Sequence, residues 1–84
     1  MKLFLISQSQ NLGYDTYDSG VVAAPDEETA RNMNLSTGHP MTAADWGSSI
    51  PDWCSGPEHV HVLYLGVAAQ GIAEGVVCAS YNAG

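Results

Sequence analysis

The segment 36–58 has no hydrophobic period, although it lies inside a chain of only 84 residues. Connections of this length without regular structure are uncommon in compact domains, so side chains must hold this one against the rest of the fold. Trp46 and Trp53 are the expected anchors, because large aromatic side chains bury the most apolar surface. The spacing of Thr42 and Asp45 is typical of a capping box and predicts a single helical turn within the segment.

Four short apolar stretches on either side of this segment predict strands. Residues 3–7 are apolar on both sides of the chain, as in an inner strand, and residues 17–24 resume extended character after a turn-rich stretch. Residues 59–65 alternate in strand fashion, and residues 76–81 form the last apolar run. Neighbours in sequence are expected to pair, which gives two hairpins. The side chains expected to share one face of the third strand are Val60, Val62 and Tyr64.

One helix is predicted after the second strand. Residues 25–28 combine a proline with acids, a typical helix start, and Glu27 can pair with Arg31 on the exposed side. Ala30 and Met33 would face the sheet, over about three turns. The sequence therefore predicts an α+β fold of a single domain (1–84), with a four-stranded, mainly antiparallel sheet in the order β-β-α-β-β. One short helix would lie on a face of this sheet, beside the long tryptophan-anchored loop.

Charge limits the partners of the chain. Nine carboxylates stand against only Lys2 and Arg31, which gives a formal net charge of -7. Two cations cannot neutralise a run of phosphates, so direct binding of nucleic acid or of an anionic membrane is not expected. A protein with a basic surface is the expected partner.

The cellular setting follows from what the sequence lacks. The apolar start of the chain ends after four residues, at Ser7, and no stretch approaches the length of a membrane span, so we expect a cytoplasmic protein. Cys54 and Cys78 are accordingly expected as free thiols. A domain this small has limited stability of its own, and homodimerisation is the commonest way to add to it.

Cys54, His59, His61 and Cys78 are enough ligands in number for a zinc ion, but they lack the tight spacing of structural zinc sites. Cys54 and His59 could also form a thiol nucleophile and its base, although no acid is placed to orient the imidazole. The simpler interpretation is a buried Cys78, a Cys54 in the loop and two solvated histidines. We therefore expect no enzymatic activity, no catalytic residues, no metal and no cofactor.

Recognition of a partner is what the remaining residues favour. Tyrosines and tryptophans lie in loops or at strand ends beside carboxylates, and these residue types dominate protein–protein hot spots. The tryptophans have a competing interpretation as plugs that fix the long loop to the sheet. The expected partner-binding residues are Tyr14, Asp15, Tyr17, Asp18, Asp45, Trp46, Asp52, Trp53 and Tyr81.

Four short segments of the chain resemble those of a group of small uncharacterised proteins encoded in bacteriophage and prophage genomes. They are residues 14–19 (YDTYDS), 21–24 (VVAA), 53–55 (WCS) and 76–84 (VVCASYNAG). The resemblance covers nearly the whole chain and implies an accessory protein acting in the cytoplasm of a host bacterium.

The expected function is that of a non-enzymatic inhibitor of a host defence or nucleic-acid-handling complex, in the manner of anti-CRISPR proteins. Two alternatives stay open. One is an oligomeric sponge for a small nucleotide-like signal. The other is a small zinc or thiol protein built on the two cysteines and His59 and His61.

Overall fold

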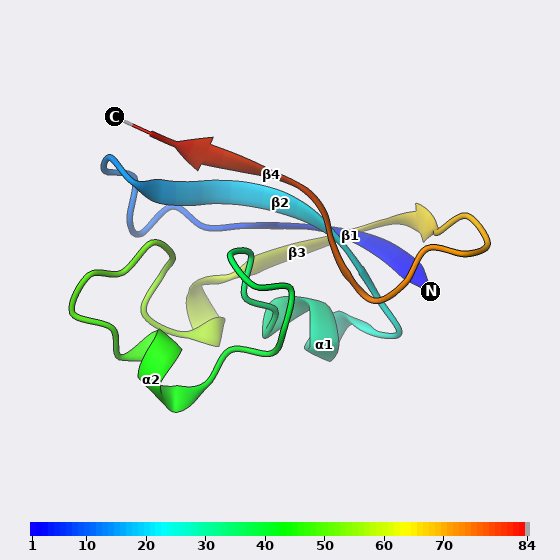
Figure 1. Cartoon of the computed structure of the whole chain (residues 1–84), viewed down its shortest axis with the longest axis horizontal. Coiled ribbons are helices and arrows are strands. Elements are labelled where there is room, and N and C mark those ends of the chain that lie inside the picture. The colour runs from blue at the N-terminus through cyan, green and yellow to red at the C-terminus, as the bar shows by residue number, and fades with distance from the viewer. Residues whose placement is uncertain (84) are drawn as a thin grey trace.

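A computed structural model describes residues 1–83. It contains a four-stranded antiparallel sheet with short helices on one side (Figure 1). The strand order is β3-β1-β2-β4. The elements are β1 (Lys2–Ser7), β2 (Thr16–Ala24), α1 (Glu27–Arg31), α2 (Ala43–Trp46), the 3₁₀ turn η1 (Pro57–His59), β3 (His61–Val67) and β4 (Gly75–Asn82).

The α+β prediction is confirmed, and so is the first hairpin. β1 pairs with β2 from Lys2 opposite Ala24 to Ser7 opposite Ser19. The second predicted hairpin is wrong, because β3 pairs with β1 and β4 pairs with β2, at opposite edges of the sheet.

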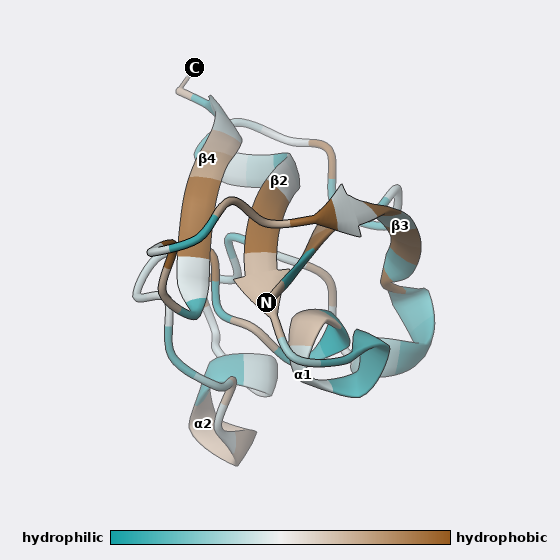
Figure 2. Ribbon diagram, turned by 90° about the vertical axis from the view of Figure 1, so that its right-hand side faces the viewer, coloured by the Kyte–Doolittle hydropathy of each residue, from teal (hydrophilic) through white to brown (hydrophobic). Residues whose placement is uncertain are grey.

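The connection between β3 and β4 explains this difference. Residues 68–74 pass the end of the sheet at which β1 begins, and the Ala68 amide donates to the Met1 carbonyl there (Figure 2). Seven extended residues reach roughly 23 Å, whereas three strand spacings need only about 14 Å. The connection is therefore long enough to join the two edges, and sequence proximity does not force the two strands to pair.

The core lies between the sheet and the helical layer. Phe4 and Ile6 of β1 and Val22 of β2 are buried against Ala30 and Met33, as predicted for the latter two. On β3 the predicted inner face is confirmed. Val60 and Val62 contribute to the core, and the Tyr64 ring packs on Phe4 with 5.6 Å between centroids.

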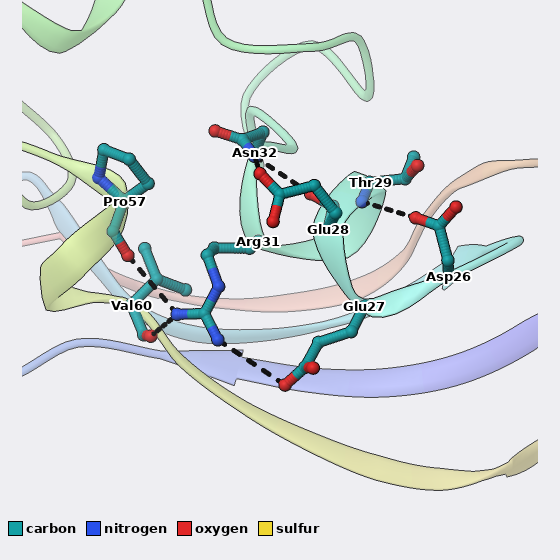
Figure 3. Close-up of polar contacts among 8 residues, drawn as sticks. All are labelled: Asp26, Glu27, Glu28, Thr29, Arg31, Asn32, Pro57 and Val60. Atoms are coloured by element: carbon teal, nitrogen blue, oxygen red, sulfur yellow. Dashed lines mark hydrogen bonds and ion pairs between the residues drawn. The ribbon is translucent and has the colours of Figure 1, made fainter.

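Both helices are short. α1 has five residues, so the prediction of about three turns is too long; the chain leaves the helix at Asn32. Its start is as predicted, with the Asp26 carboxylate accepting from the Thr29 amide at 2.8 Å (Figure 3). In α2 the predicted capping box of Thr42 and Asp45 is confirmed in both directions. The two caps hold the pKa values of the Asp26 and Asp45 carboxyls below their usual range.

Arg31 ties α1 to the start of β3. Its Nη1 donates to the Val60 carbonyl at 2.6 Å and to the Pro57 carbonyl at 3.4 Å (Figure 3). Its Nη2 lies 3.5 Å from Glu27 Oε1, which confirms the predicted pair. One of the two cations in the chain is thus engaged with the backbone.

Trp53 anchors the long loop, with only 4% of its surface exposed, and Trp46 packs on the core while half-buried. Leu35 fills the space that Gly20 leaves on β2, since a Cβ on Gly20 would lie 2.5 Å from Leu35 Cδ2. The segment 36–58 is therefore attached to the sheet by buried side chains, as its lack of a period requires.

Candidate partner-binding site

Three segments meet where β1 ends and β2 begins, at the left of Figure 1. They are the β1–β2 turn, the end of β4 and the last part of the long loop. Each contributes side chains that the sequence singled out. We call Asp15, Tyr17, Asp52 and Tyr81 the tyrosine–aspartate cluster.

Gln8 organises the β1–β2 turn from inside. Its buried side chain donates to the carbonyls of Asn11, at 2.6 Å, and Tyr17, at 2.9 Å. Its Oε1 accepts from the amides of Gln10 and Asn11. Buried amide groups of this kind rigidify a turn because all their hydrogen-bonding capacity is used within it.

The long loop is joined to this turn by hydrogen bonds to the backbone carbonyls of the loop. The Asn11 side chain donates to the carbonyls of Pro51, at 3.1 Å, and Trp53, at 3.2 Å. Between them, the Asp52 carbonyl accepts from the Tyr17 amide at 2.8 Å. These bonds bring Asp52 beside the tyrosines although it is far from them in sequence.

Tyr17 and Tyr81 pack edge to face, with ring centroids 4.8 Å apart. The Tyr81 hydroxyl donates to Asp15 Oδ1 at 3.4 Å. Asp15 itself has a left-handed backbone (φ 59°), which Asp adopts more readily than most residues. Partial burial, and next the negative charge of Asp15, raise the pKa of Tyr81 above its usual value.

This contact predicts a pH effect. Because the pKa of Tyr81 is higher in the folded than in the unfolded chain, its contribution to stability is present below the ordinary tyrosine pKa. That contribution is lost as pH rises through the raised value. Asp15→Asn removes the charge and is expected to lower the pKa of Tyr81. The measurement is the tyrosinate absorbance titration of each protein, with Tyr81→Phe identifying the contribution of Tyr81. An unchanged Tyr81 titration in Asp15→Asn would contradict the contact.

The other expected partner-binding residues are distributed unevenly. Tyr14 is 75% exposed and adjoins the cluster, and Asp18 is exposed on β2, at an irregularity in the pairing with β4. Asp45 and the half-buried Trp46 lie on α2, apart from the tyrosines. Trp53 lies in the core, which is the position that its competing interpretation as a plug predicts.

Two surface hollows adjoin the long loop. One, of about 300 Å³, has Asp45 and Asp52 in its lining and so connects α2 with the cluster. The other, of about 420 Å³, lies between residues 35–40 and the start of β4 and includes Glu74. Neither has a lysine or arginine among its lining residues in the described part of the chain. A phosphate-bearing ligand would thus meet carboxylates in both.

The four residues considered for zinc do not converge. Cys78 is exposed on β4, so the expectation that it is buried is wrong, whereas Cys54 lies in the long loop as expected and is buried there. His61 and Cys78 lie on opposite edge strands, roughly 14 Å apart by strand spacing. Within residues 1–83 no group of three or more His, Cys, Asp or Glu side chains could hold a metal ion.

The environment of Cys54 does not favour the thiol alternative, since its Sγ donates to the Gly56 carbonyl at 3.4 Å. Burial raises the pKa of Cys54, which disfavours the thiolate that a nucleophile requires.

The chain was also compared with known proteins. No protein-family model, curated protein or solved structure matches it. In the part of the chain that the structure describes, no helix is long and apolar enough to cross a membrane.

The sequence interpretation missed Gln8 and Asn11, on which the geometry of the site depends. Both are polar residues in a turn-rich stretch, where their usual position is at the surface. Three of the four Gln8 bonds are to backbone groups two or three residues away, so a turn closed by the Gln8 side chain is a local possibility. The bond to the Tyr17 carbonyl, which encloses the side chain against β2, depends on the hairpin.

Proposed function

We propose that this protein is a non-enzymatic binding protein that covers a basic surface on another protein with its tyrosine–aspartate cluster. The observation that supports this most strongly is the meeting of Asp15, Asp52 and the two packed tyrosines from three separate segments. Amphipathic rings bordered by charges are typical of interface hot spots.

The positions of the cations add to this argument. Lys2 lies at the far end of β1 from the cluster, and Arg31 is bonded to backbone carbonyls. The negative potential at the cluster is therefore not neutralised by a neighbouring cation. Such a potential steers a basic partner toward the site and raises the association rate.

The resemblance to phage and prophage proteins suggests the finer proposal. The basic surface would belong to a host defence or nucleic-acid-handling complex in the bacterial cytoplasm, and covering it would inhibit that complex. Surfaces that bind nucleic acid are basic, so a small acidic protein can compete for them.

The test is capture from host lysate on the immobilised protein, with release by heparin as a polyanionic competitor. The cluster variant combines Asp15→Asn and Asp52→Asn with Tyr14→Ala, an exposed residue that adjoins the cluster. Its control, Glu27→Gln with Glu28→Gln, loses the same charge on α1. We expect the captured basic protein to bind the cluster variant at least roughly thirty-fold more weakly, the equivalent of one hot spot of about 2 kcal/mol. Equal binding to wild type and cluster variant, or recovery of nucleic acid alone, would contradict the proposal.

A further inference from the structure

The sheet has a second face, opposite the helical layer. Residues directly opposite each other in antiparallel strands point to the same side. The pairing therefore places Leu63, Leu5, Val21 and Cys78 in one row across all four strands. We call this side the open face. Its side chains are Leu3, Leu5, Ser7, Ser19, Val21, Ala23, His61, Leu63, Cys78 and Ser80.

The helical layer does not cover the open face, although its exposure is uneven: Ala23 is fully buried and Leu3, Leu5 and Val21 are half-buried. α1 and the long loop bury their apolar side chains on the other side of the sheet, against Phe4, Ile6 and Val22. Leu63 is 58% exposed, and Leu65 and Val77 beside the apolar row are also exposed. Figure 2 shows hydrophobic colour along β2, β3 and β4. A contiguous apolar surface of this kind on a small protein marks an interaction site.

Charge is distributed very unevenly between the two sides. The open face has no Asp, Glu, Lys or Arg among the described residues, although the chain has nine acids. The strands contain only two charged residues, Lys2 and Asp18. The other eight acids lie in the helices, turns and loops.

This distribution of charge indicates which kind of molecule can bind the open face. A basic protein would find no opposite charge there, and a negatively charged membrane would be repelled by the rest of the molecule. A second copy of the chain offers an identical apolar surface. When two open faces meet, the acids of α1 and α2 lie on the far side of each sheet from the interface, which reduces the repulsion between bodies of charge -7.

The edge strands are consistent with association through the face of the sheet. Neither β3 nor β4 contains a proline or a charged residue, but the pairing of each with its neighbour is interrupted by an extra residue, Leu65 in β3 and Val77 in β4. Such bulges disfavour the addition of a further strand at an edge, so a second copy is expected to bind through the face.

We propose that the open face is the interface of a homodimer, in which two sheets pack face to face about a two-fold axis. Packed sheets lie about 10 Å apart, with side chains of the two faces interdigitating. The face measures roughly 20 Å by 20 Å from strand spacing and rise, or about 800 Å² over both copies, which is below the roughly 1,200 Å² of stable specific interfaces, so the association is weak. The tyrosine–aspartate cluster is at the end of the sheet and stays accessible in the dimer.

Sedimentation equilibrium tests the proposal. The wild type is expected to dimerise with a micromolar Kd, and Leu63→Glu to weaken it by at least thirty-fold, because the row then carries a buried charge in both copies. Ile50→Glu adds the same charge to an apolar residue on the long loop, which is 87% exposed, and is expected to leave the Kd within twofold. A wild type that stays monomeric at several hundred micromolar overturns the proposal, as does a dimer that Leu63→Glu leaves intact.

Two further measurements do not depend on the variants. Alkylation of Cys78 is expected to slow about fivefold at a total concentration tenfold above the Kd, by mass action, while the buried Cys54 reports on unfolding. Added salt is expected to strengthen the dimer, because it screens the repulsion of like charges. Binding of a basic partner by the cluster would weaken in salt. Because salt is expected to act in opposite directions on the dimer and on partner binding, either proposal can be refuted without the other. Cys78 alkylation independent of concentration overturns the dimer.

Discussion

Trp53→Ala is expected to lower the free energy of unfolding by about 3–5 kcal/mol, as for other buried tryptophans. Domains of this size have a total stability of roughly 4–13 kcal/mol, so the variant loses a large share of it. Trp53 is buried between the sheet and the loop that it anchors. Its removal leaves a cavity and also loosens the end of the segment 36–58, whose remaining apolar attachments are the buried Cys54 and the half-buried Met41 and Trp46. Urea denaturation followed by circular dichroism measures the effect.

Two other variants serve as controls. Trp53→Phe keeps an aromatic ring in the core and removes Nε1, a buried donor without a hydrogen-bond partner in the described structure, so its loss of stability is expected to be clearly smaller. Trp46→Ala is also expected to cost less, because Trp46 is only half-buried. Equal losses for Trp46→Ala and Trp53→Ala would contradict the anchoring role.

Trp53→Ala is also expected to affect the candidate partner-binding site. The Tyr17 amide donates to the Asp52 carbonyl, next to Trp53, so loosening the loop exposes this bond. Hydrogen exchange of the Tyr17 amide is expected to speed up in Trp53→Ala and to stay slow in Trp53→Phe. Faster exchange of the Tyr17 amide in both variants would contradict the expectation that an aromatic ring at position 53 is enough to hold this bond.

What the sequence could predict follows the range over which each signal acts. The capping box of Thr42 and Asp45 and the existence of the four strands depend on neighbours a few residues apart, and the structure confirms them. The bounds of the third strand are wrong by two residues, because η1 takes up His59 and β3 runs from His61 to Val67. The pairing partner of β4 depends on which edge of the sheet is free, and no local pattern contains that information. The β3–β4 connection has the turn residues of a hairpin, yet its length permits the wider crossing that the structure shows.

Burial is harder to predict than strand position, because it also depends on contacts between segments far apart in sequence. The expected burial of Cys78 is wrong, because an apolar last strand indicates a covered strand unless one face of the sheet is known to be open. Gln8 shows the opposite error, a polar side chain that is buried because backbone partners surround it. The convergence of Asp52 with Tyr81 likewise depends on the whole fold.

Arg31→Met is expected to destabilise the protein by about 2–3 kcal/mol, the usual range for hydrogen bonds to a charged donor. Methionine retains much of the length of the side chain and loses the donors to the Val60 and Pro57 carbonyls. The matched control is Glu27→Gln, which removes only the exposed ion pair and is expected to cost less than about 0.5 kcal/mol.

The salt dependence of this loss distinguishes the two roles of Arg31. Bonds to half-buried backbone carbonyls are screened little, so the difference between wild type and Arg31→Met is expected to persist in high salt. A difference that vanishes in salt would assign the stability to the surface pair with Glu27 instead. The persistent result would mean that Arg31 is committed to joining α1 to β3. Lys2, at the far end of the sheet from the cluster, would then be the one cationic side chain not bonded to backbone carbonyls. A single such cation is consistent with the proposal that the protein binds a partner through its carboxylates and does not bind phosphates.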